Sequence, residues 1–375
     1  MVQVRRVQLD ELEMPLVEPF ETSFGVERRR RFLVLRIESE DGETGLGECV
    51  ATRDPLYSSE SVATARWMIE TYLLPLLWRE GALAPPIFRA RAQAWRGHPM
   101  AKAAVEMALW DLWARRHRQS LAHALGSRRR RVEVGVSVGI QPSVPTLVRR
   151  VGDYLADGYR RIKIKVRPGW DERPVAALRR EFPDIRLWVD ANQAYPASAV
   201  AAIRRWATRY AVEQVEQPFP EHALATHAQL VRGARFRVCL DESITDLATL
   251  EAAIGMQALT SLNVKAGRVG GLGAGRELGE RAARARLPAW VGGMLETGIG
   301  RAHNVALASL SPFTFPADLS ASDRYYQPDL VEPAFELGPG STLSVPSGRG
   351  IGVDVVESIY RRHLRRHREF RRKTA

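Results

Sequence analysis

The sequence contains very little cysteine and no long apolar segment. Cys49 and Cys239 are the only cysteines among 375 residues, and they lie far apart in apolar surroundings, which excludes a disulfide framework and a thiolate zinc site. No apolar run approaches the roughly 20 residues that a helix needs to cross a bilayer. Residues 1–20 also lack the apolar core and cleavage site of a secretory signal. We therefore expect a cytoplasmic protein without membrane contact.

Acidic residues are outnumbered, since 43 Asp and Glu face 55 Lys and Arg, for a formal net charge of +12. Much of this excess lies in three runs, at residues 28–31, 128–131 and 361–368. Such runs are typical of solvated faces and frayed ends, so we do not expect a nucleic-acid partner. The charge favours a small anionic substrate. A basic, non-catalytic binding protein is the alternative from another functional class.

The apolar pattern divides the chain into three predicted regions, at residues 1–130, 131–325 and 326–375. In the first region, residues 32–37 and 44–50 are typical of strands joined by a turn at Asp41-Gly42. Residues 59–77 and 100–118 have the periodicity of helices. The first region is therefore predicted to be a small α+β domain.

In the second region, a short apolar strand, a polar turn and an amphipathic helix recur. Strand ends fall near Ser137, Lys163–Lys165, Asp190, Glu216, Asp241, Lys265, Gly292–Glu296 and Asp318. Eight such units in succession close most economically into a (β/α)8 barrel. We predict an α/β protein in which the N-terminal domain caps a TIM-type barrel. Residues 333–337 and 341–345 are predicted strands that return to the capping domain, and a basic helix without an evident partner follows.

Charged side chains end most of the predicted strands: Lys163, Lys165, Asp190, Glu216, Asp241 and Lys265. A charge buried at a strand end costs several kcal/mol unless it is paired, metal-bound or catalytic, and the strand ends of a barrel converge on one site. Three carboxylates on consecutive strands suit Mg²⁺. A lysine beside a cation and a second lysine has a lowered pKa and suits a general base. A network of structural ion pairs is the alternative.

Glycines are frequent between Gly267 and Gly275, directly after Lys265. This string lacks the G-x-G-x-x-G spacing of a dinucleotide site, and no acidic residue follows at the required distance. We interpret the glycines as permitting a tight turn.

Five motifs resemble, in order and spacing, those of the muconate lactonizing subgroup of the enolase superfamily. They lie at residues 163–165, 190–192, 216–218, 241–243 and 265–271. The resemblance covers the whole chain except the basic tail. It implies a Mg²⁺ cofactor, with Mn²⁺ as a substitute, that stabilises the enediolate formed when a lysine removes the proton beside a carboxylate.

Further strings resemble the o-succinylbenzoate synthase / N-succinylamino acid racemase group. They lie at residues 20–25, 57–60, 98–102, 135–139 and 292–304. This resemblance implies proton transfer by Lys165 and Lys265 from opposite faces of the substrate, with Lys163 as an electrostatic helper and Asp190, Glu216 and Asp241 as metal ligands. It places Ser137, Asn192, Arg268, Gly293, Met294 and Phe24 at the substrate, with the loop of Phe24 acting as a lid.

The resemblance implies a hydro-lyase that dehydrates a cyclohexadiene hydroxyacid to 2-succinylbenzoate for menaquinone synthesis. The alternative is racemisation of N-succinylamino acids, and one protein can do both. Two sister activities are disfavoured. Asp318-Leu319-Ser320 lacks the acidic pair that dipeptide epimerases carry after the eighth strand. No histidine ends the predicted seventh strand, whereas mandelate racemase and the acid-sugar dehydratases use a histidine late in the barrel. Arg268 keeps racemisation open, although it can equally be a loop arginine that faces solvent or a carboxylate. Relatives form symmetric homo-oligomers, so we expect one here.

Overall fold

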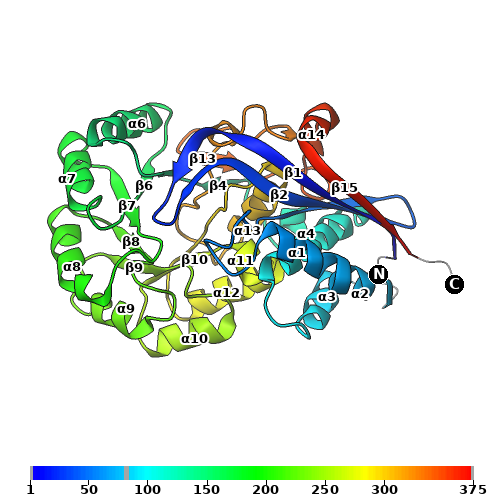
Figure 1. Ribbon diagram of the computed structural model, residues 1–375, viewed down its shortest axis with the longest axis horizontal. Coiled ribbons are helices and arrows are strands. Elements are labelled where there is room, and N and C mark those ends of the chain that lie inside the picture. The colour runs from blue at the N-terminus through cyan, green and yellow to red at the C-terminus, as the bar shows by residue number, and fades with distance from the viewer. Residues whose placement is uncertain (1–2, 80–83, 373–375) are drawn as a thin grey trace.

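The structure, a computed structural model, describes residues 3–79 and 84–372. Two parts lie side by side: a barrel surrounded by helices, and a smaller domain in which a long twisted sheet covers one end of the barrel (Figure 1). This arrangement confirms the predicted α/β barrel with an α+β cap. The division of the chain at residues 130 and 325 stays a prediction.

The capping domain is built on a four-stranded antiparallel sheet in the order β15-β1-β2-β3. Its strands are β1 (Val4–Glu21), β2 (Val26–Ser39), β3 (Thr44–Cys49) and β15 (Leu364–Arg371). The predicted hairpin is present, and Gly42 in its turn has a φ of 85°, a left-handed conformation that favours glycine. The long strand β1, which the sequence analysis did not predict, pairs with β2 over most of its length.

Helices of the capping domain pack against this sheet, and α4 lies over β3 and β2. They are α1 (Val62–Met68), a π-helical turn (Ile69–Leu73), α2 (Leu74–Arg79), α3 (Pro85–Ala92), α4 (Pro99–Arg116) and α5 (Leu121–Ala124). The helices predicted at 59–77 and 100–118 are thus confirmed. Strand β3 and helix α4 lie very close together at Gly47. A Cβ atom added to Gly47 would lie only 2.1 Å from the carbonyl oxygen of Ala104.

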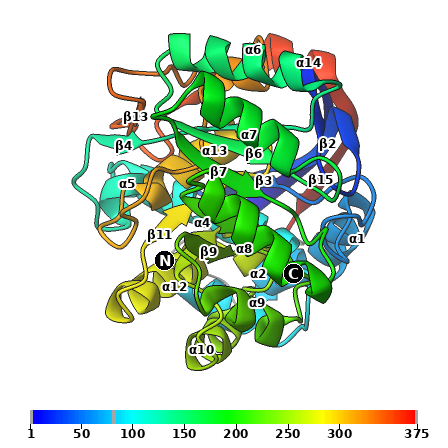
Figure 2. The same ribbon diagram turned by 90° about the vertical axis from the view of Figure 1, so that its left-hand side faces the viewer.

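Seven parallel strands form the barrel wall in the order β5 to β11. They are β5 (Val136–Val138), β6 (Arg161–Lys165), β7 (Arg186–Asp190), β8 (Gln214–Glu216), β9 (Arg237–Leu240), β10 (Ser261–Val264) and β11 (Ala289–Val291). Helices follow the strands, and several of them line the outer edge of the barrel in Figure 2. They are α6 (Val144–Ala156), α7 (Glu172–Glu181), α8 (Val200–Arg209), α9 (Leu224–Val231), α10 (Leu247–Gly255), α11 (Ala266–Val269), α12 (Leu272–Arg284) and α13 (Gly298–Ala308). Short 3-10 turns occur at Ala197–Ala199 and Ser322–Arg324.

The predicted eighth strand is irregular. Ala317 bridges to Val134, and Asp318 bridges to Gly292 at the end of β11, so this segment closes the ring between the first and seventh strands. Pro312 and Pro316 stand in the segment, and proline lacks the N–H that a regular ladder requires. The eight-unit prediction therefore holds for ring closure, but the last position contains isolated bridges in place of a regular strand.

The C-terminal predictions need correction. Residues 333–337 form no strand; β12 (Val331–Glu332) pairs with β14 (Asp354–Val355), and Pro333 directly after β12 cannot donate to a ladder. Strand β13 (Thr342–Ser344) pairs with β4 (Arg131–Glu133), beside the barrel, and not with the capping sheet.

The basic tail was predicted to be a helix without a partner, and this is wrong beyond residue 363. Helix α14 (Glu357–His363) ends there, and β15 continues antiparallel to β1 with Arg368 opposite Leu9. The partner is the otherwise open edge of β1, which is more than 300 residues away in the chain and so invisible to local periodicity.

Two further expectations can be compared with the structure. Gly270 and Gly271 have φ values of 92° and 129° between α11 and α12, which confirms that the glycines after Lys265 permit a tight turn. Within the described ranges, no helix combines the length and the apolar character needed to span a membrane.

Candidate active site

A cavity of about 400 Å³ lies between the carboxyl ends of the barrel strands and two loops of the capping domain. Its lining includes most of the predicted site residues: Phe24, Ser137, Lys163, Lys165, Asn192, Lys265, Gly293 and Met294. The loop that carries Phe24 contacts the loop after β3, since the Phe24 and Tyr57 rings lie 6.3 Å apart. This volume suits a small organic acid.

Strand alternation places the lysines inside the barrel. In β6, Ile162 and Ile164 are buried outward among the apolar residues that pack on the helices, whereas Lys163 and Lys165 alternate with them and point to the barrel axis. Below Lys163, the interior is filled by Trp188 and Trp290, and the Lys163 Nζ atom lies 4.8 Å from the centre of the Trp290 ring. The Lys163 amine therefore stands on an aromatic layer that fills the barrel below the cavity.

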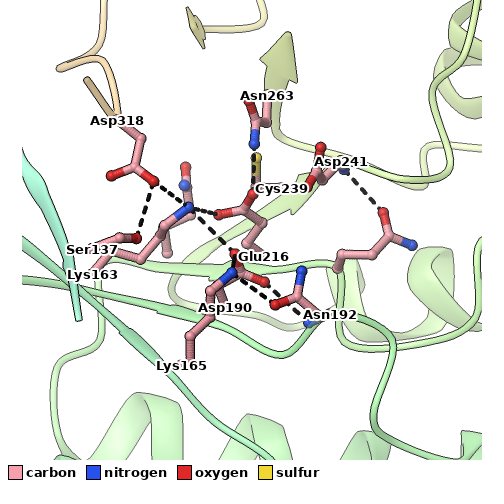
Figure 3. Close-up of polar contacts among 12 residues, drawn as sticks. Ser137, Lys163, Lys165, Asp190, Asn192, Glu216, Cys239, Asp241, Asn263 and Asp318 are labelled. Carbon is pink, nitrogen blue, oxygen red and sulfur yellow. Dashed lines mark hydrogen bonds and ion pairs between the residues drawn. The ribbon is translucent and has the colours of Figure 1, made fainter. Parts of the chain in front are cut away.

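Lys163 and Lys165 are bound to the neighbouring carboxylates (Figure 3). Lys165 Nζ donates to Asp190 Oδ2 at 2.6 Å and to Asn192 Oδ1 at 2.7 Å. Lys163 Nζ lies 2.9 Å from Glu216 Oε2 and 3.3 Å from Asp190 Oδ2, so that one amine bridges two carboxylates. Parallel pairing brings the two carboxylates together beside Lys165, because Lys165, Asp190 and Glu216 are register partners on adjacent strands.

Lys265 enters from the other side of the cavity. Its Nζ donates to Asp241 Oδ2 at 2.7 Å and to the Tyr57 hydroxyl at 3.3 Å. Arg268 also pairs with Asp241, and its Nε donates to the carbonyl of Ile244 at 2.9 Å. Arg268 is buried and lines a neighbouring cavity, not the one that holds the lysines. For a loop arginine the sequence left two surroundings open, solvent or a carboxylate, and Arg268 faces a carboxylate.

Charge pairing shifts the pKa values of this cluster. Burial disfavours the ammonium of Lys163, but Asp318 and Glu216 outweigh burial and raise its pKa; the pKa of Lys265 is likewise raised, by Tyr57 and Glu242 against burial. Asp190 is also buried, yet Lys165 and Lys163 lower its pKa to about 2. At Lys163 and Lys265 the described side chains therefore act against the lowered pKa that a general base requires.

The three acidic residues suit Mg²⁺ by their chemistry. Asp190, Glu216 and Asp241 are buried and supply only carboxylate oxygens, the ligands that hard divalent cations prefer. Within the described part of the chain, however, no three Asp, Glu, His or Cys side chains stand close enough together to hold an ion. Each carboxylate contacts an amine instead. The assignment of these residues as metal ligands stays a prediction.

Two residues of the site were not singled out from the sequence. Asp318 accepts hydrogen bonds from Ser137 Oγ and Arg161 Nη1, both at 3.0 Å, and pairs with Lys163 at 2.9 Å. Tyr57 joins Lys265 to the capping domain. Asp318 was noted only as a strand end and in the comparison with dipeptide epimerases, and Tyr57 only as part of a motif, because their partners lie far away in sequence.

A compositional signal was also missed. The chain has only five lysines among its 55 basic residues, and three of the five line this cavity: Lys163, Lys165 and Lys265. Arginine cannot lose its proton in a protein, whereas lysine can. Lysine thus occurs where proton transfer would need it, in a chain that uses arginine almost everywhere else.

Comparison with known proteins gives the family. Residues 4–126 match the N-terminal domain of mandelate racemase / muconate lactonizing enzyme, and residues 146–359 match the enolase C-terminal domain-like family. An N-succinylamino acid racemase of Thermus thermophilus is 44% identical over 94% of this chain and 95% of its own. An o-succinylbenzoate synthase of Geobacillus stearothermophilus is 40% identical over 98% and 97%.

Solved structures agree with these matches. An enolase superfamily member from Listeria innocua, which is 36% identical, superposes over the full length of both chains with a TM-score of 0.95. Together with the two domain matches, this likeness shows that the chain belongs to the mandelate racemase / muconate lactonizing enzyme family of the enolase superfamily.

Proposed function

We propose that this protein is a Mg²⁺-dependent o-succinylbenzoate synthase that eliminates water from a cyclohexadiene hydroxyacid, a menaquinone-pathway step. The observation that carries the proposal is the pair of amines, Lys165 and Lys265, that enter one cavity from opposite sides of the barrel. Five relatives named o-succinylbenzoate synthase, 35–40% identical, support the choice.

In the proposed mechanism, the substrate carboxylate lies beside Lys163 and the carboxylates that would hold Mg²⁺, and Lys165 removes the proton from the adjacent carbon. The C–O bond of the neighbouring ring carbon then breaks, and the hydroxyl group leaves as water with the proton that Lys165 took. Asn192 and Asp190 orient the Lys165 amine through their hydrogen bonds. Lys163 adds positive charge beside the new anion. Mg²⁺ held by Asp190, Glu216 and Asp241 would supply the charge that stabilises the enediolate. Aromatic side chains and the capping loops line the cavity and would limit the access of water to the reacting carbon.

Racemisation of N-succinylamino acids is the second candidate. Two lysines on opposite faces of one carbon explain inversion directly, because one takes the proton and the other returns a proton. Relatives named N-succinylamino acid racemase, 44% and 46% identical, favour it as well. Both reactions use a small carboxylate substrate and the same lysines, so one enzyme can catalyse both. We also propose that Mn²⁺ can replace Mg²⁺ and that the protein forms a homo-oligomer.

The test uses the purified full chain with Mg²⁺ and both substrates. Dehydration is followed by the absorbance of the aromatic product, and racemisation by NMR exchange of the α-proton in D₂O. Lys165→Ala and Lys265→Ala should each lower turnover by about 10²- to 10⁴-fold. In the racemase assay, each variant should still exchange the α-proton of one enantiomer only, because one lysine remains on one face.

Lys102→Ala is the control, since Lys102 lies on α4 and donates to the carbonyl of Trp95. Its rates should stay within about twofold of those of the wild type. Racemisation without dehydration would establish the second candidate. Unchanged turnover in both variants, or no turnover of either substrate by the wild type, would refute the proposed function.

A further inference from the structure

The wall of the cavity that belongs to the capping domain is strongly basic. Seven basic and three acidic side chains line the cavity as a whole. Three of the basic ones are the lysines of the barrel, and the other four are Arg28, Arg29, Arg30 and Arg53 of the capping domain. Arg29 pairs with Glu13 at 3.0 Å. The capping side of the lining therefore carries more positive than negative charge, with these four arginines beside Glu27 and Asp54, whereas the three lysines at the strand ends are paired with carboxylates.

Arg30 is the buried member of this arginine group. It stands on β2 opposite Met14, and only 2% of its surface is exposed. Its Nη2 donates to the carbonyl of Val50, whereas its Nη1 is buried without a hydrogen-bond partner. Within residues 3–79 and 84–372, no carboxylate forms an ion pair with Arg30. A guanidinium is always charged, and an unpaired buried charge costs several kcal/mol.

Other buried arginines are better satisfied. Arg161 pairs with Asp318 at 3.0 Å and donates to the carbonyl of Ala317. Arg301 also lacks a carboxylate partner, but both of its Nη atoms donate to backbone carbonyls, and it does not line the cavity. Arg30 thus combines three features: a desolvated positive charge, a free donor and a position on the cavity wall.

We propose that Arg30 binds a second carboxylate of the substrate, the one at the far end of the succinyl chain. This inference rests on the proposed function, because both candidate substrates carry such a group. A guanidinium edge fits a carboxylate, and charge-assisted bonds of this kind are strong. Arg28 and Arg53 are exposed at the mouth of the same cavity and add attraction for a dianion as it enters.

The lining between the lysines and the arginines of the capping domain suits the methylene groups of such a chain. Phe24, Leu56, Tyr57 and Met294 all contribute to it. Phe24 and Leu56 are 37% and 59% exposed, and an apolar chain lying between them would cover part of this surface. The proposed order is therefore carboxylate at the lysines, methylenes along the apolar lining and carboxylate at Arg30.

The test compares two substrates that differ only at the far end: N-succinyl-phenylglycine and its neutral succinamoyl analogue. In Arg30→Met, kcat/KM for the succinyl substrate should fall by about 10- to 100-fold, mainly through KM, while the value for the analogue changes less than threefold. Arg31→Met is the matched control, because Arg31 is the neighbouring residue on β2, pairs with Glu13 at 2.9 Å and does not line the cavity. It should leave both values unchanged.

A binding measurement separates this inference from the proposed function. Calorimetry with succinate and with succinamate as probes requires no turnover. Stronger binding of succinate by the wild type, lost in Arg30→Met and kept in Arg31→Met, supports the subsite even if neither acyl substrate is turned over, and only the proposed function then fails. Should Arg30→Met not fold, Arg30→Lys replaces it, and its preference for succinate should be reduced but not abolished. Equal losses for the charged and the neutral probe would refute the subsite.

Discussion

Glu48 of the capping sheet holds the barrel helix that follows the seventh strand. Its carboxylate accepts hydrogen bonds from Thr297 N at 3.1 Å, Thr297 Oγ1 at 2.6 Å and Gly300 N at 2.9 Å, at the N-terminus of α13. Burial raises the pKa of Glu48 to about 8, against these hydrogen bonds. We predict that Glu48→Gln changes the stability of the protein with a sign that depends on pH.

The magnitude follows from proton linkage. Between the ordinary pKa of 4.5 and a folded pKa of about 8, the folded protein keeps a proton that the unfolded chain releases. Glu48 therefore lowers the free energy of unfolding by about 1.4 kcal/mol for each pH unit across this window, about 5 kcal/mol in all. Glutamine does not titrate. It accepts fewer of the three hydrogen bonds, which costs about 1–3 kcal/mol at every pH.

Urea unfolding of wild type and variant at pH 5, 6.5 and 8.5 measures the difference. At pH 5 the variant should be the less stable protein by about 1–3 kcal/mol, and at pH 8.5 it should be the more stable one by a few kcal/mol. Glu40→Gln, which changes an exposed carboxylate near the same sheet, should give a small difference at every pH. A Glu48→Gln difference that stays constant with pH would show that the hydrogen bonds keep the carboxylate ionised, contrary to this reasoning.

Three further predictions concern other parts of the molecule. Removal of divalent ions with EDTA should abolish turnover, and Mg²⁺ or Mn²⁺ should restore it without a change in the far-UV circular dichroism; activity that survives chelation would contradict the metal assignment. Trp188→Ala, at a fully buried position in the aromatic layer of the barrel, should lower the free energy of unfolding by about 3–5 kcal/mol in urea, whereas a loss below about 1 kcal/mol would refute its packing role. Asp318→Asn removes the anion that faces Lys163 and should lower kcat/KM by about tenfold or more with the fold intact, an effect that a merely structural contact would not produce.

Much of the barrel and the chemistry of its strand ends could be predicted from the sequence, because both depend on short-range periodicity. Alternation with period two in residues 161–165 places both lysines on one face, and the regular recurrence of strand ends places Asp190 and Glu216 on neighbouring strands. Local turn chemistry also predicted the hairpin at Gly42 and the tight turn at Gly270. These features need no knowledge of distant contacts.

Tertiary structure alone decided the features that depend on partners far away in the chain. The open edge of β1 makes residues 364–371 a strand, although their local pattern predicted a helix. Asp318 becomes part of the site only because ring closure brings it to Lys163, and Tyr57 only because the capping domain lies over Lys265. The charge and type of these side chains are local properties. Which charge faces which, and which one has no carboxylate beside it among the described residues, as at Arg30, depends on how the distant segments pack.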